Sequence, residues 1–328
     1  MDLFSTDTLV GIVQDLRSRV SAQPTLLSMF FPALIEEASE EIHFDTEDKP
    51  RRIAPFVNPL LEGKLVESLG HGTKTFKPAY IKDKRVFDST RPLRRMMGEA
   101  LTGNMTPSAR QAQLLALELA DQLQMVRKRK EVMAGEAMAL GQVTVDGEGF
   151  PTVVVNFGRD AGQTLDISGG AGEWSAGGSK DPLGNIETWS ELMLKNSGAA
   201  PTDIVMTPTP WSAFRADAKF EKAVDLRRAG GDNVVSMVAP VNVGLQYVGQ
   251  MGQRRIWTYY DWYVNDAGTE VPVLADGTVL LASGSMEGVQ VHGAIRDEEA
   301  GFQATEFWTK TWVQQDPSVR YLLGQSAP

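Results

Sequence analysis

The stretch from Pro107 to Leu140 constrains the fold of this chain more than any other segment. After Pro107 it contains no proline, and Gly135 is its one glycine. Thr106 precedes it as a candidate N-cap, and proline suits the first helical position, where its missing N–H costs nothing. Apolar residues recur at spacings of three, four and seven, the pattern of one buried helical face: Ala112, Leu115, Leu119, Leu123, Val126, Met133, Ala137 and Leu140. We therefore predict one helix, roughly 50 Å long at about 1.5 Å per residue, which must span several packing partners.

Composition excludes several classes of protein. A length of 328 residues suffices for two domains with cores of their own, and no run of eighteen apolar residues predicts a membrane span. The start, Met1-Asp2-Leu3-Phe4, lacks the basic and apolar regions of a signal peptide. The absence of cysteine excludes disulfides and thiolate metal sites and fits a reducing compartment. A net charge of -10 disfavours a general nucleic-acid binder. We expect a soluble cytoplasmic product.

The segments before the helix have too little regular structure to form a hydrophobic core, and hence a domain, of their own. Residues 1–40 read as an arm with one short helical face and an apolar cluster at 26–31 that needs a surface to pack on. Residues 41–90 read as extended chain, with strands at 42–46 and 75–87 and a turn at Gly70-His71-Gly72. Four prolines in this stretch forbid a well-paired central strand. We expect its apolar side chains to be buried against other chains.

The segments after the helix predict a mixed α and β region. Strands are expected at 152–157, 203–206, 245–263 and 271–281, with a hairpin turn at 265–268. Helices are expected at 185–195 and from Thr209 onward, and residues 158–182 read as a glycine-rich surface loop anchored by Trp174. Further strand-like sequence lies at 288–311, and residues 321–323 form a last apolar segment. The expected class is α+β.

The search for catalytic chemistry yields little. The three histidines, His43, His71 and His292, are far apart, and no spacing typical of a zinc site occurs. The glycine-rich runs match neither the phosphate loop nor the dinucleotide fingerprint, and no nucleophile-elbow motif is present. The acidic run 297–299 reads as a solvated turn, although it could chelate a cation. We predict no catalytic, cofactor-binding or metal-binding residue and hence no enzyme.

The basic run 127–130 lies inside the long helix. Four successive helical residues point in four directions, so the run cannot form a one-sided phosphate platform. We interpret it as a solvated or salt-bridged turn of the helix. A contact with acidic residues of another subunit is the alternative.

Short peptides in a fixed order connect the chain with a known family. They are Phe30-Phe31-Pro32, Ala54-Pro55-Phe56-Val57-Asn58-Pro59, Phe76-Lys77-Pro78-Ala79-Tyr80-Ile81-Lys82, Arg91-Pro92, Trp211-Ser212-Ala213-Phe214-Arg215, Asp225-Leu226-Arg227-Arg228 and Gln325-Ser326-Ala327-Pro328. With the order of arm, extended loop, long helix and mixed region, the chain resembles the major capsid proteins of tailed phages, which have the Hong Kong 97 fold. In these short peptides the chain most resembles the lambda-type major head proteins. The resemblance covers nearly the whole chain.

The resemblance implies a division of the chain. It makes 1–40 the N-terminal arm and 41–90 the extended loop that lies over a neighbouring subunit. It makes 91–182 and 286–328 the peripheral domain, with the spine helix at 108–140, and 183–285 the axial domain. The glycine-rich region at 158–182 fits the family pattern poorly.

The resemblance also implies a function. The protein is expected to assemble as pentamers and hexamers into a closed icosahedral shell that encloses double-stranded DNA without sequence-specific binding. Decoration, portal, scaffolding and protease proteins are its expected partners, without a membrane, and the virion capsid assembled in the host cytoplasm is its expected location. The apolar residues of the arm and loop are the expected assembly contacts: Phe30, Phe31, Phe56, Val57, Leu60, Leu61, Phe76 and Tyr80.

Two other functions stay open at this point. An encapsulin-like shell of a bacterial nanocompartment would share the fold, but the long loop and its preceding arm favour a phage head. An α/β enzyme with an unrecognised site would need a cluster of acid, base and nucleophile, and the sequence shows none.

Overall fold

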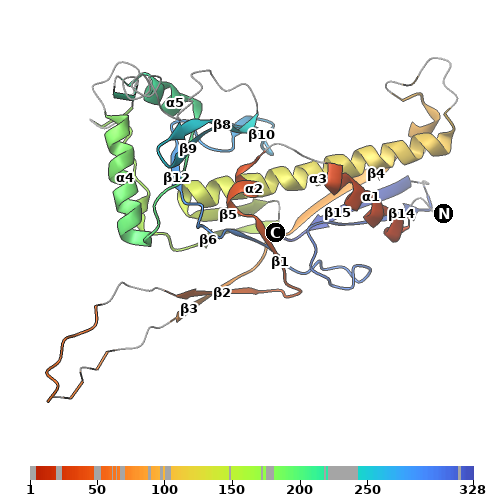
Figure 1. The fold of residues 1–328 in the computed structure, drawn as a ribbon. Coiled ribbons are helices and arrows are strands. Elements are labelled where there is room, and N and C mark those ends of the chain that lie inside the picture. Colours follow the sequence, from red (N-terminus) through yellow and green to blue (C-terminus); the bar gives the residue numbers. More distant parts are fainter. Residues whose placement is uncertain are drawn as a thin grey trace.

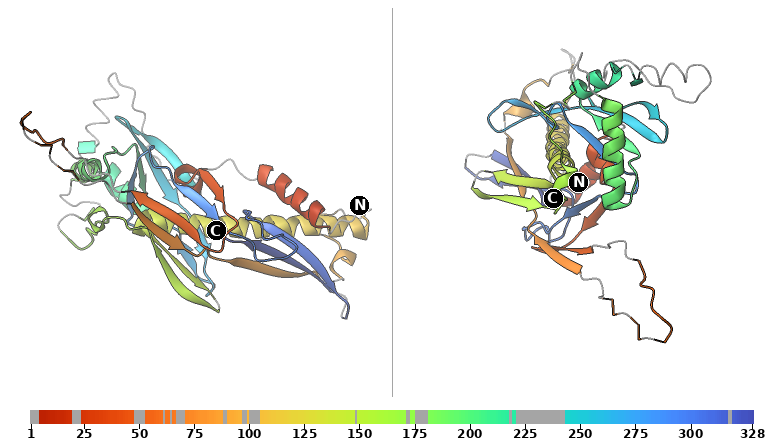
Figure 2. Two further views of the ribbon diagram at one scale, coloured as in Figure 1. Left: turned by 90° about the horizontal axis from the view of Figure 1, so that it is seen from below. Right: turned by 90° about the vertical axis from the view of Figure 1, so that its left-hand side faces the viewer.

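A computed structural model of the chain describes residues 5–19, 24–47, 53–60, 62–63, 65–66, 71–87, 90–96, 99, 105–147, 149–170, 173–174, 181–217, 219–220, 243–316 and 319–328. It has the predicted α+β character. The body is elongated around one long helix, and a two-stranded hairpin projects from it (Figure 1). Both views of Figure 2 show this hairpin leaving the body.

The long helix α3 spans Pro107–Leu140, as predicted. The Thr106 hydroxyl accepts a hydrogen bond from the Ala109 N–H at 3.3 Å, and Gly141 ends the helix in the left-handed region at φ 69°. The expected apolar face is buried from Leu115 to Val126. Leu140, predicted on that face, is instead 58% exposed. In the second half of α3 the buried residues no longer follow the predicted stripe: they are Lys130, Glu131, Val132, Ala134, Gly135 and Met138.

One end of α3 packs on a three-stranded antiparallel sheet. Its order is β14 (Trp308–Gln314), β15 (Val319–Ser326) and β4 (Ile81–Phe87). Helix α1 (Thr6–Arg19) lies against β14 and shares a core with α3. That core contains Leu9, Val13, Phe87, Leu114, Leu115, Leu119, Leu123, Val126, Phe307 and Leu322. The helical face of the arm therefore packs on its own subunit.

The segment 41–90, predicted as extended chain, divides between a projecting hairpin and the body. The expected strand at 75–87 is two strands, β3 (His71–Phe76) and β4, with Pro78 between them. Strand β3 pairs with β2 (Ile42–Glu47), so His71 and Gly72 belong to a strand and the turn expected there is wrong. Strand β4 pairs with β15 and is part of the body. The region that leaves the body is the β2–β3 hairpin and its tip.

The other end of α3 meets a four-stranded sheet. Its order is β12 (Val279–Ala282), β7 (Asp203–Met206), β9 (Arg254–Tyr260) and β8 (Gly244–Met251), with β7 and β9 parallel. Strand β7 is buried throughout, as predicted. Helices α4 (Pro182–Ser197) and α5 (Pro208–Arg215) accompany this sheet. Their core includes Trp174, Ile186, Ile204, Met206, Trp211, Phe214, Phe220 and Ile256.

The glycine-rich region reaches into the same core. Trp174 is buried and stacks on Trp189 with 5.6 Å between ring centroids, and Ile167 packs against the cluster. The anchoring role expected of Trp174 is confirmed. Residues on both sides of the expected domain boundary at 182/183, Trp174 and Ile186 among them, share this hydrophobic cluster.

Short elements complete the body. Strands β5 (Gln142–Gly147) and β6 (Phe150–Asn156) form a hairpin, as do β10 (Trp262–Val264) and β11 (Glu270–Pro272) around the predicted turn. Single 3-10 turns lie at η1 (Arg91–Leu93) and η2 (Ala161–Gln163). Helix α2 (Leu26–Phe30) precedes β1 (Ala33–Glu36), which pairs in parallel with β13 (Val289–His292).

Candidate assembly surfaces

The tip of the hairpin presents apolar side chains to solvent. Phe56 is fully exposed, and Leu60 and Leu65 are 92% and 94% exposed. Val57 is also exposed, whereas Leu61 lies outside the described residues. Apolar side chains concentrated on a protruding segment mark an interaction site. Phe56, Val57 and Leu60 are thus exposed in the single subunit, and their role as assembly contacts stays a prediction.

Phe30 has a different environment. It is 3% exposed inside a core that also contains Val132, Val205 and Tyr259. The expectation that residues 26–31 need a surface to pack on is met by α3 and β9 of the same chain. Phe30 is therefore a core residue of the subunit and not an exposed assembly contact, since α2 packs on α3 and β9 of the same chain.

Phe31, Phe76 and Tyr80 are half-buried near the base of the hairpin. The Tyr80 hydroxyl donates to Gln325 Oε1 at 2.6 Å and accepts from the Arg296 N–H at 3.0 Å. Burial raises the pKa of the Tyr80 phenol above its ordinary value. Tyr80 thus ties the start of β4 to the end of the chain.

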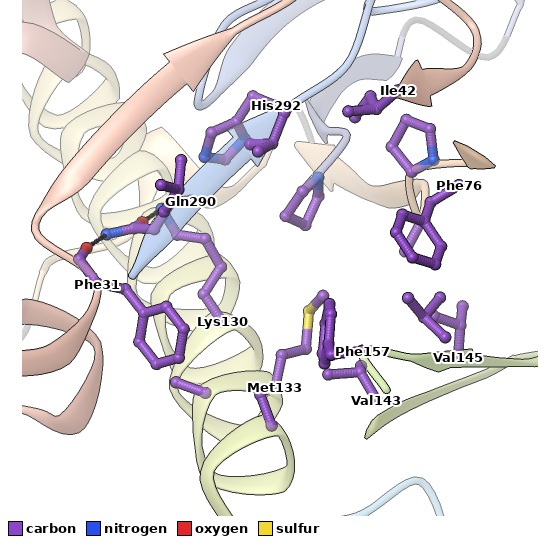
Figure 3. Close-up of a pocket in the computed structure, with 18 of the residues that line it drawn as sticks. Phe31, Ile42, Phe76, Lys130, Met133, Val143, Val145, Phe157, Gln290 and His292 are labelled. Atoms are coloured by element: carbon purple, nitrogen blue, oxygen red, sulfur yellow. Dashed lines mark hydrogen bonds between the residues drawn. The ribbon is translucent and has the colours of Figure 1, made fainter. Parts of the chain in front are cut away.

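An apolar pocket lies where the hairpin, the arm and α3 meet, with a volume of ≈ 170 Å³ (Figure 3). Phe31 and Met133 contribute to one side, and Phe76, Val145 and Phe157 contribute from the two hairpins. Gln290 fixes the arm beside it, because its Nε2 donates to the Phe31 carbonyl at 2.7 Å. None of the described residues 53–66 lines this pocket.

A buried carboxylate docks the arm onto the body. Glu131 is 5% exposed and accepts hydrogen bonds from the Leu26 and Leu27 N–H groups at 2.8 and 2.9 Å. It also accepts from the Tyr259 hydroxyl at 2.9 Å. Burial, and then the charge of Glu131, raise the pKa of the Tyr259 phenol far above its ordinary value, so Tyr259 stays protonated and donates. One side chain therefore connects the arm, the long helix and β9.

The side chains of the basic run 127–130 point in different directions and reach different partners. Lys128 bonds both oxygens of Asp261 at 2.6 Å, and the buried Lys130 pairs with Glu306 at 2.6 Å. The predicted salt-bridged turn is confirmed for these two residues. Sequence reasoning missed that Lys130 and Glu131 are buried anchors. A signal existed, because Lys130 follows Val126 by four residues on the predicted buried face.

A second buried carboxylate fastens the parallel pair β7–β9. Asp203 receives Nε and Nη2 of Arg255 at 2.7 Å each, the Thr202 hydroxyl at 2.7 Å and the Trp257 indole N–H at 2.9 Å. Burial alone would raise the pKa of Asp203. The hydrogen bonds outweigh it and hold the pKa below its ordinary value.

The described residues hold no group of three or more His, Asp or Glu side chains that could bind a metal ion. Within that same part of the chain, no helix is both long and apolar enough to cross a membrane. The acidic run 297–299 is partly neutralised, since Asp297 pairs with Lys310 at 2.5 Å.

The fold belongs to a class, the α+β architecture of the Hong Kong 97 type. A solved structure of a putative prophage capsid protein from E. coli CFT073 superposes with a TM-score of 0.73 at 20% identity, covering 98% of this chain and 94% of that one. A phage-related protein from Bordetella bronchiseptica RB50 gives a TM-score of 0.50 at 12% identity, covering 97% and 91%.

Sequence comparison narrows the class to a family. The family model described as phage major capsid protein E matches residues 5–328, so the chain belongs to that family. The major capsid protein of Escherichia phage lambda is 26% identical over 334 residues, covering 100% of this chain and 95% of that protein. The major capsid protein of Enterobacteria phage phi80 is 27% identical with the same coverage. The resemblance noted in the sequence is confirmed.

Proposed function

We propose that this chain is the shell subunit of a phage head, assembling as pentamers and hexamers into a closed icosahedral particle around double-stranded DNA. The observation that carries the proposal is the projecting hairpin, whose tip exposes Phe56, Leu60 and Leu65 to solvent. Within a family of major capsid proteins, such a tip is an unfilled contact with a further copy of the chain.

The geometry suits rings. The projecting tip and the body are different surfaces, so a contact between them is heterologous and closes into a ring when the rotation permits. Because the tip lies at the end of a two-stranded hairpin, it can adapt to the slightly different angles between neighbouring subunits in a pentamer and in a hexamer. Each subunit contacts several neighbours, and many modest contacts add up to a stable shell.

The division of labour follows the two cores. We assign the α1–β14–β15–β4 core with the first half of α3 to the peripheral domain, and the β12–β7–β9–β8 core with α4 and α5 to the axial domain. The continuous core around Trp174 supports moving the 158–182 region to the axial side. The β2–β3 hairpin is the extended loop.

The remaining roles follow from charge and family. A chain with net charge -10 repels packaged DNA and contains it without sequence-specific binding. We propose a structural role without catalysis, assembly in the host cytoplasm, and portal, scaffolding, protease and decoration proteins as partners.

Electron microscopy and analytical sedimentation of the purified protein test the proposal. The expected species are pentamers, hexamers or closed shells. A compact monomer as the sole species at high protein concentration, in several salts, would contradict it.

A further inference from the structure

We propose that the phenyl ring of Phe56 inserts into the apolar pocket of a neighbouring copy, at the junction of its α3, its arm and its two hairpins. This deepens the proposed function, on which it rests, by naming the two surfaces that meet. The projecting residue and the receiving pocket are both unfilled in the single subunit.

The volume of the pocket suits one aromatic ring. The pocket encloses ≈ 170 Å³, and an engineered apolar cavity of about 150 Å³ holds one benzene molecule. Phe56 carries the one aromatic ring among the described tip residues 53–66, and this ring is fully exposed. The pocket walls are mostly aromatic and aliphatic, with Lys77, Lys130, Gln290 and His292 as the polar lining residues. Phe76 and Phe157 lie 6.2 Å apart by ring centroids at a tilted angle. A third ring would complete an aromatic cluster of the kind that proteins favour.

The direction of the hairpin indicates that the Phe56 filling a pocket comes from a second copy and not from the same chain. The tip does not line its own pocket, and Figures 1 and 2 show the hairpin leading away from the body. The pocket is partly built by the hairpin's own base, through Ile42, Phe44 and Phe76. A tip inserted into the next pocket therefore braces the base of the next hairpin. The contact then propagates from subunit to subunit in one direction around a ring.

Cross-linking tests the assignment directly, because the chain contains no cysteine. The test variant is Phe56→Cys with Met133→Cys, which puts one thiol on the tip and one in the pocket. The matched control is Phe56→Cys with Leu117→Cys. Leu117 lies on the same helix, is 56% exposed and is outside the pocket. Each variant is assembled with an equal amount of wild-type subunits, so that shells form even where the variant alone assembles poorly and many variant subunits still lie next to one another.

Mild oxidation of the shells should convert the Met133→Cys variant into disulfide-linked dimers and higher species, with the peptides containing positions 56 and 133 joined in mass spectra. The Leu117→Cys control should stay monomeric. Absence of the 56–133 link in intact shells, or preferential linking at Leu117→Cys, would overturn the pocket assignment. If wild-type protein forms no shells, the proposed function fails instead, and the two failures are thereby distinguished.

Discussion

At the scale of single residues, two buried carboxylates hold together segments that are far apart in the chain. Glu131 and Asp203 are each nearly inaccessible, and each has its oxygens satisfied by several donors. A buried charge that is fully hydrogen-bonded fixes one arrangement of its partners, since any shift leaves it unsatisfied. Both residues are therefore sensitive to substitutions that keep their size and remove only the charge.

Glu131→Gln should lower the free energy of unfolding by roughly 1.5–3 kcal/mol, the typical worth of a hydrogen bond to a charged group. The amide NH2 would face the Leu26 or Leu27 N–H, which has no acceptor left. Urea unfolding measures the loss, and faster proteolysis at the arm should accompany it. Glu191→Gln, exposed on α4, is the control and should leave stability unchanged. Equal stabilities for the two variants would mean that Glu131 does not dock the arm.

Asp203→Asn should remove a part of the stability that depends on pH. The pKa of Asp203 is lower in the folded state than the ordinary value of about 3.9 in the unfolded state. Its contribution is therefore fully present above the unfolded value and disappears as pH falls through the folded value. The wild-type advantage over Asp203→Asn should be constant from pH 7 to about 5 and shrink below about pH 4. Denaturant titrations across that range check this, with Asp266→Asn in an exposed turn as control. A difference independent of pH would contradict the assignment.

At the scale of elements, sequence predicted what local pattern determines and missed what distant partners determine. The bounds of α3 and of β7 were correct because caps, periodicity and β-branched content are written locally. The split between β3 and β4 was missed, because the position of each strand is set by its partner, β2 in one case and β15 in the other. The same reason explains Phe30 and Leu140, whose burial depends on which surface arrives beside them. Of the candidate contacts, the exposed tip could be predicted and the pocket could not, since segments that are far apart in the chain, from Leu27 to Pro328, build it.

Leu119→Asp should prevent folding. Leu119 is fully buried in the core shared by α1, α3 and β15. Loss of its packing alone costs about 2–5 kcal/mol, and an unpaired buried carboxylate adds to this, against a typical domain stability of roughly 5–15 kcal/mol. We expect insoluble protein. Leu117→Asp is the matched control, because Leu117 is exposed two residues away on the same helix. Soluble Leu119→Asp subunits with the wild-type melting temperature would show that α3 does not pack through this face.

At the scale of the whole molecule, folding and assembly use different parts of the chain. The cores are built from α3 and the two larger sheets, and the tip at 53–66 contributes to none of the hydrophobic clusters of the described residues. Stability of the subunit and stability of the shell can therefore change independently.

Replacing residues 53–66 with a short Gly-Ser turn should abolish shells and leave the subunit folded. The tip makes no core contact, so circular dichroism and the melting temperature should barely change, while particles disappear from electron micrographs. A variant of the same length, in which only exposed polar residues of the tip are exchanged, should still form shells. An unfolded replacement variant would mean that the tip belongs to the subunit core.

The pairing of β1 with β13 has a consequence for the order of events during synthesis. Gln290 binds the Phe31 carbonyl across 259 positions of the chain, and β13 gives β1 its only strand partner among the described strands. At about 5–20 residues per second, a ribosome needs roughly 13–50 s to travel that distance. During this interval Leu26 and Phe30 have been made, but the strand that completes their docking has not. The arm is thus among the last segments to reach its final place. A nascent chain therefore carries an N-terminal segment without its strand partner until β13 has been made, and only then can it present the completed pocket to its neighbours.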